Sequence, residues 1–69
     1  MGERQRALTY VRGLYARYVA GLKSGRLPRF VETFYRERVH HLGRDIEIMQ
    51  AEGEDGLDVA RRWCLVAGC

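Results

Sequence analysis

Hydrophobic residues recur along this chain at helical spacing, in stretches that glycine-containing turns separate. The first stripe consists of Leu8, Val11, Tyr15, Tyr18 and Leu22. Alternating intervals of three and four residues place such side chains on one face of an α-helix. The spacing therefore predicts a helix over about residues 3–24, which Gly25 would end in a left-handed cap.

A second stripe follows after a short loop and consists of Tyr35, Val39, Leu42, Ile46 and Met49. It predicts a helix over about residues 28–52, with Pro28 in the first turn because its fixed φ is already helical. The turn sequence GEDG precedes a third, shorter helix, over about residues 56–67, with Asp55 as its cap. No stretch alternates with a period of two, so we expect no strand.

These elements predict an all-α fold, a single domain over residues 1–69. The first two helices should form a long antiparallel hairpin, with the third helix across one end or alongside. A chain this short rarely builds a core worth more than about 3–5 kcal/mol. We therefore expect the hairpin to be completed by dimerisation.

The two cysteines, Cys64 and Cys69, do not change this expectation. On a continuous helix they would lie about 140° apart, at ~100° per residue, which is poor geometry for a disulfide. We therefore expect free thiols. Oligomerisation is then the remaining source of extra stability.

The second helix carries another apolar line, displaced from its stripe by about 100°. This line holds Phe30, Phe34, His41 and Ile48. A two-helix hairpin cannot bury both lines, and a short third helix cannot cover the whole of the second one. We therefore expect part of it to contact either a second copy or another protein. The candidate interface residues are Tyr10, Arg17, Phe30, Phe34, Arg38, His41, Ile48 and Trp63.

Charge is distributed unevenly along the chain. Residues 1–30 hold seven Lys or Arg and one acid, a net of +6, whereas residues 31–69 have a net of −3. An antiparallel hairpin would bring Arg4 and Arg6 toward the acids near residues 52–58, so we favour charge matching within or between subunits. The alternative is nonspecific contact with nucleic acid phosphates. For that role the candidates are Arg12, Lys23, Arg26 and Arg29.

Glu37 and His40 have the E-x-x-H spacing that can hold a metal ion on one helical turn. However, Val39 and Leu42 point into the hairpin, which turns Glu37 and His40 away from it. We therefore expect no metal and no cofactor. No nucleophile lies beside an oriented base, and no strand precedes the glycines of the loop, so we do not expect an enzyme.

The first ten residues carry charge without a following apolar stretch, and no apolar run approaches the length of a membrane span. We expect a cytoplasmic protein without a membrane partner. The layout of two helices around KSGRLPRF resembles small helical hairpins such as type III secretion co-chaperones and phage-encoded inhibitors of host regulators. The expected function is that of a small bacterial or phage regulator that binds a larger protein, and the alternative is a basic nucleic-acid-associated protein.

Overall fold

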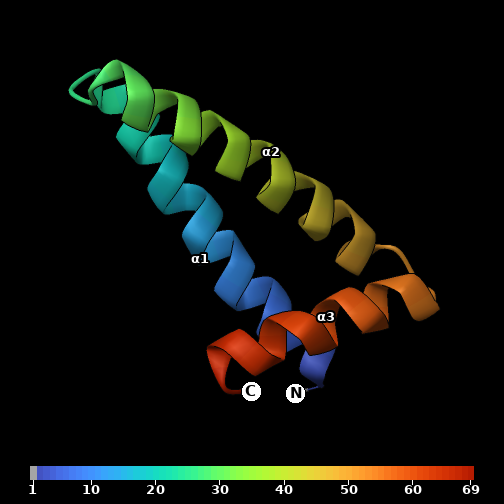
Figure 1. Cartoon of the computed structure of the whole chain (residues 1–69). Helices are drawn as coiled ribbons and strands as arrows, with labels where there is room; N and C mark the ends of the chain where they lie inside the picture. Colours follow the sequence, from blue (N-terminus) through green and yellow to red (C-terminus); the bar gives the residue numbers. More distant parts are fainter. Residues whose placement is uncertain (1) are drawn as a thin grey trace.

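The computed structural model describes residues 2–69, and across them the chain is all-helical, with three helices and no strand (Figure 1). The helices are α1 (Glu3–Ser24), α2 (Arg29–Gln50) and α3 (Glu54–Ala67). The all-α class predicted from the sequence is confirmed.

The helix ends follow from local backbone chemistry. Gly25 has a φ of 67°, and its N–H donates to the carbonyl of Leu22, which closes α1. Pro28 lies just outside α2 as its N-cap, because its extended backbone conformation cannot belong to the helix. Gly53 is the N-cap of α3, so Asp55 lies inside the first turn, where a carboxylate favours the positive end of the helix.

α1 and α2 meet at the loop between them and spread apart toward their other ends, where α3 lies across the opening (Figure 1). Near the loop, Tyr35 of α2 packs against Gly21 of α1, where an added Cβ would lie only 2.6 Å from the ring. Further along, Gly43 of α2 faces Tyr15 of α1. Only the first contact depends on a missing side chain, because a Cβ at Gly43 would meet the Tyr15 ring at an ordinary 3.5 Å.

The buried core lies entirely at the α3 end. Its residues are Ala7, Leu8, Val11, Leu42, Met49, Val59, Ala60 and Cys64. We call residues 2–11 and 42–69 the head and residues 12–41 the arm. No residue of the arm is fully buried, since the arm has only two helices to cover each other.

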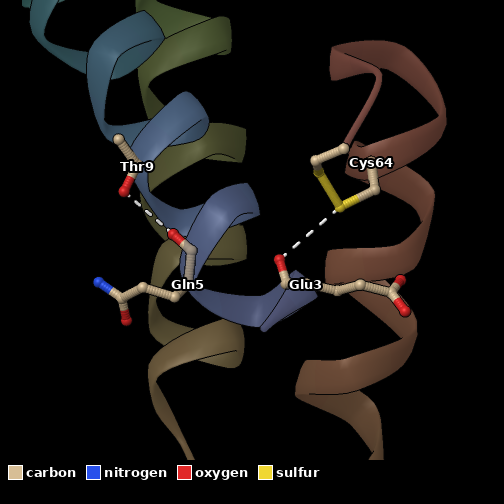
Figure 2. The surroundings of a disulfide bond; sticks show 5 residues. Glu3, Gln5, Thr9 and Cys64 are labelled. Atoms are coloured by element: carbon tan, nitrogen blue, oxygen red, sulfur yellow. Dashed lines mark hydrogen bonds between the residues drawn. A yellow bond between two sulfur atoms is a disulfide. The ribbon is translucent and has the colours of Figure 1, made fainter. Parts of the chain in front are cut away.

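The expectation of free thiols is wrong, because Cys64 and Cys69 form a disulfide (Figure 2). The expectation assumed a continuous helix, but α3 ends at Ala67 and Gly68 adopts a left-handed conformation with a φ of 78°. This residue turns the chain back and brings the two cysteine Cα atoms to 4.7 Å. A single glycine thus decides whether the cysteines can meet.

The start of α1 also reaches the loop between α2 and α3, but not by the expected contact between charges. The Nη2 of Arg4 donates a hydrogen bond of 2.8 Å to the carbonyl of Gly53 rather than to a carboxylate. The first turn of α1 is therefore held to the far end of α2 by a backbone acceptor.

Candidate interaction surface on the arm

Two phenylalanines are the most solvent-exposed aromatic residues of the arm. Phe30 is 78% exposed and Phe34 is 52% exposed, one helical turn apart at the start of α2. Large apolar side chains in water cost free energy unless something covers them, and contiguous exposed patches mark contact surfaces. The pair is therefore the centre of the candidate site.

A cluster of aromatic rings supports Phe34 from the side of α1. Tyr18 lies edge-on to Tyr35, with ring centroids 4.8 Å apart, and edge-on to Phe34 at 6.4 Å. Such edge-to-face pairs stabilise one ring arrangement beyond the area that they bury. Tyr18 and Tyr35 are only half-buried, so the cluster holds Phe34 in place without a closed core beneath it.

Two arginines border this cluster. The guanidinium carbon of Arg38 lies 5.8 Å from the centroid of the Tyr18 ring, within the range of a cation–π contact. Arg17 lines a shallow hollow together with Leu14, Tyr18 and Tyr35. We call Arg17, Tyr18, Phe30, Phe34 and Arg38 the aromatic–basic surface.

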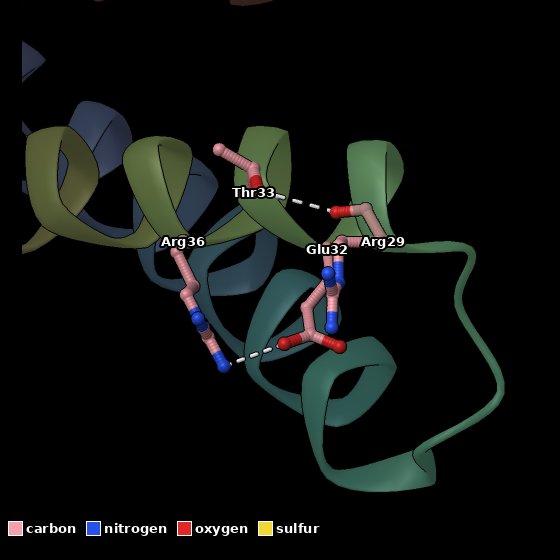
Figure 3. Close-up of polar contacts among 4 residues, drawn as sticks. All are labelled: Arg29, Glu32, Thr33 and Arg36. Carbon is pink, nitrogen blue, oxygen red and sulfur yellow. Dashed lines mark hydrogen bonds and ion pairs between the residues drawn. The ribbon is translucent and has the colours of Figure 1, made fainter.

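The arm as a whole is strongly basic. Its seven Lys and Arg against two Glu give a net of +5, whereas the head has a net of −2, which together make the +3 of the chain. One of the two acids, Glu32, forms an ion pair with Arg36 (Figure 3). The other cations of the arm are therefore opposed by only one further carboxylate of the arm, Glu37.

The structure divides the predicted interface residues into two groups. Arg17, Phe34 and Arg38 come together around Tyr18, with Phe30 one turn away. His41 is exposed at the boundary with the head, and its ring stands edge-on to that of His40 at 5.7 Å. These five predicted residues all belong to the arm.

The other three lie on the head and serve its internal packing. The Nε1 of Trp63 donates a 2.9 Å hydrogen bond to Oδ2 of Asp45, and its ring lies 6.1 Å from that of Tyr10. Ile48 packs against the buried core. The second apolar line of α2 is therefore covered at Ile48 and uncovered at Phe30 and Phe34.

The four residues considered for nucleic acid are all exposed on the arm. Lys23, Arg26 and Arg29 lie on or next to the loop between α1 and α2. Arg12 lies 11 residues before Lys23 on the same helix, about 16 Å away at ~1.5 Å per residue. Three of the four cations therefore lie at the loop end of the arm.

The helical stripes alone do not reveal two features of the molecular surface. They place Tyr18 and Tyr35 in the packing between the two helices, whereas the structure leaves both residues half-buried in an open ring cluster. On the head, Leu65 is 87% exposed, and Val66 lines an open hollow with Trp63, Asp45, Val59 and Arg62. The apolar sequence CLVAGC was the available signal for this second patch.

Glu37 and His40, the E-x-x-H pair, both point to solvent. Over residues 2–69, no three His, Cys, Asp or Glu side chains gather closely enough to hold a metal ion. The helices of this same part of the chain include none long and apolar enough to cross a membrane.

The chain has no match among known families. Comparisons with protein-family models, with curated proteins and with solved structures each found no similar protein.

Proposed function

We propose that this protein is a small non-enzymatic regulator that binds a larger protein through the aromatic–basic surface of its arm. It would act as an inhibitor, adaptor or co-chaperone on a partner such as a transcription regulator or a component of a secretion or pilus machinery. The observation that carries this proposal is the exposure of Phe30 and Phe34, at 78% and 52%, beside bordering arginines.

Aromatic and arginine side chains are the types that dominate binding energy at interfaces. Covering a fully exposed Phe side chain is worth about 1.5–3 kcal/mol. Tyr18 already holds Phe34 by an edge-on contact, so binding would cost little further ordering of that ring. The surface is thus both apolar and partly organised before a partner arrives.

The net charge of the arm predicts which kind of protein surface would bind it. The net of +5 on the arm favours a protein with an acidic surface around an apolar groove or helix face. Capture of such a partner should weaken as salt is raised, because solvent-exposed charges are screened within about 10 Å at 0.1 M.

The test is a pull-down followed by mass spectrometry, with Phe34→Asp as the variant. Leu65→Asp is the matched control, since it places the same charge on an exposed apolar position of the head. We expect one partner to be captured by the wild type and the control and lost with Phe34→Asp. Equal capture by all three proteins would contradict the proposal.

We also propose that the chain forms a homodimer. Two arms, each with a net of +5, repel one another, whereas the head is acidic around Glu52, Glu54, Asp55 and Asp58. The arrangement that charge favours therefore places each arm against the head of the other copy, in a closed twofold pair. This pair covers the aromatic–basic surface, so a second copy and the partner protein compete for it. Sedimentation equilibrium tests this: we expect a dimer for the wild type and a monomer for Phe34→Asp, and a monomeric wild type would contradict it.

A second candidate function is binding to nucleic acid, which the exposed cluster of Lys23, Arg26 and Arg29 favours. Several phosphate contacts would give a steep fall of affinity with salt. A triple change of these residues to Glu should abolish that binding, whereas Arg61→Glu with Arg62→Glu, on the head, should not. Absence of DNA or RNA binding by the wild type at low salt would exclude this function.

A further inference from the structure

The two sulfurs of the disulfide lie in different surroundings. Cys64 is 9% exposed and belongs to the buried core of the head, whereas Cys69 is exposed. A thiolate that opens a disulfide must reach one sulfur and displace the other. We therefore expect a thiolate to attack the more exposed residue, Cys69, with Cys64 as the leaving sulfur.

A hydrogen-bond acceptor lies close to the sulfur that is displaced. The Sγ of Cys64 lies 3.7 Å from the carbonyl oxygen of Glu3, the approach drawn as a dashed line in Figure 2. A disulfide sulfur carries no hydrogen and cannot donate to this carbonyl. Once Cys64 is released and protonated, its S–H can donate to Glu3, so the open form gains a contact within sulfur hydrogen-bond range.

Opening the disulfide does not release the end of α3. The N–H of Gly68 donates a 2.8 Å hydrogen bond to the carbonyl of Cys64, which closes the helix independently of the sulfur atoms. The covalent ring spans a sequence separation of only 5, so its closure removes less freedom from the unfolded chain than the closure of a longer loop would. The bond can therefore exchange while the fold persists.

The surroundings of Cys69 favour a negatively charged reagent. An open hollow at this end of α3 is lined by Glu3, Arg61, Arg62, Cys64, Leu65 and Cys69. Among the side chains that line the hollow, two carry a guanidinium group and one carries a carboxylate, so positive side-chain charge is in excess and favours an anion at moderate salt. Leu65 adds an apolar wall.

We propose that this disulfide is a thiol-exchange site, at which an anionic low-molecular-weight thiol becomes attached to Cys69. The thiolate sulfur attacks Sγ of Cys69, forming a mixed disulfide, and the Sγ–Sγ bond breaks with its electron pair going to Cys64. Cys64 then takes a proton from water. The number of disulfide bonds is unchanged, so the attachment itself needs no external oxidant or reductant.

The test uses the oxidised full chain and reduced glutathione as the probe, without oxygen. Free thiols are trapped by N-ethylmaleimide after denaturation, and tandem mass spectrometry locates both groups. We expect glutathione on Cys69 and N-ethylmaleimide on Cys64, in at least about tenfold excess over the reverse, because access decides which sulfur is attacked. Equal amounts of glutathione on the two cysteines, or more on Cys64, would overturn the proposal. A protein whose two cysteines stay reduced in air would overturn it as well.

A second measurement tests the preference for anions. Arg61→Gln with Arg62→Gln should slow the reaction with glutathione by about threefold at low salt, because exposed charges act over roughly a Debye length. Arg26→Gln with Arg29→Gln makes the same change in net charge on the arm and should leave the rate unaltered. The wild type should also react faster with glutathione than with cationic cysteamine, and Arg61→Gln with Arg62→Gln should reduce this preference. The proposal of a selective site would be contradicted if both double variants slowed the glutathione reaction equally, or if the preference over cysteamine stayed unchanged.

Discussion

The head and the arm share α1 and α2, and both parts present hydrophobic residues at the same alternating spacing. In the head, α3 packs across both helices, and eight hydrophobic residues become buried. In the arm, the same two helices have only each other, and every residue keeps some exposure. Identical periodicity thus gives a core in one place and an open surface in the other.

The direction of α3 explains where one region ends and the other begins. The 22 residues of α2 extend about 33 Å at ~1.5 Å per residue. Because α3 lies across the open ends of α1 and α2 and not alongside them, it covers only that part of the pair (Figure 1). The head is therefore the stabilising region, and the arm is a support that presents Phe30 and Phe34.

The sharpest test of this difference is the same truncation in both regions. Leu42→Ala, in the head, should destabilise the protein by about 3 kcal/mol, because it leaves a cavity at a fully buried site. Leu22→Ala, at a half-buried site of the arm, should cost only about 1 kcal/mol, since less area is lost. Urea denaturation followed by circular dichroism measures both, and equal losses would remove the distinction between head and arm.

A smaller effect is expected from Gly56→Ala, which adds a methyl group to the head. Its Cβ would lie 2.7 Å from the carbonyl oxygen of Ile48 and 3.0 Å from that of Ala51, so α3 must shift. We expect a loss of about 2 kcal/mol. The control is Gly13→Ala in the arm, where nothing lies within 4 Å and the better helix former should add about 0.5–1 kcal/mol. Denaturation curves in which both substitutions shift the free energy of unfolding in the same direction would contradict this expectation.

Gly21→Ala tests the packing of the arm itself. The added Cβ would lie 2.6 Å from Cε2 of Tyr35, which must move, but helix propensity compensates in part. We expect a net loss of about 1 kcal/mol, with faster amide exchange confined to the arm. Gly43→Ala, at the edge of the head, is the control, because its Cβ would meet Tyr15 of the arm at an ordinary 3.5 Å. Faster exchange in the head would show that the arm is not an independent unit.

The smallest effect on stability should come from Phe34→Asp. The side chain is already 52% exposed, but the change removes edge-on contacts with Tyr18 and Tyr35, so we expect a loss of about 0.5–1 kcal/mol. The melting curve, measured below the concentration at which the chain associates, checks this. A large loss of stability would mean that Phe34 is part of the fold and that its effect on binding is indirect.

The helices themselves follow from the sequence. Spacing, Gly25 and Pro28 determine the all-α class, and the stripe residues Leu8, Val11, Leu42 and Met49 are indeed buried. Local rules suffice here because helix formation and capping depend on neighbours three or four positions away.

The sequence did not determine which apolar residues stay uncovered, or that the cysteines meet. Phe30 and Ile48 belong to one predicted line, yet only Ile48 is covered, because α3 reaches that end of α2 and not the other. Glycine can adopt right-handed or left-handed backbone conformations, and the left-handed conformation of Gly68 brings Cys69 back to Cys64. The first outcome depends on where a distant helix lies in space, and the second depends on the backbone conformation of one glycine five residues or fewer from both cysteines. Helical periodicity encodes neither of them, because it describes only which residues share a face of a continuous helix.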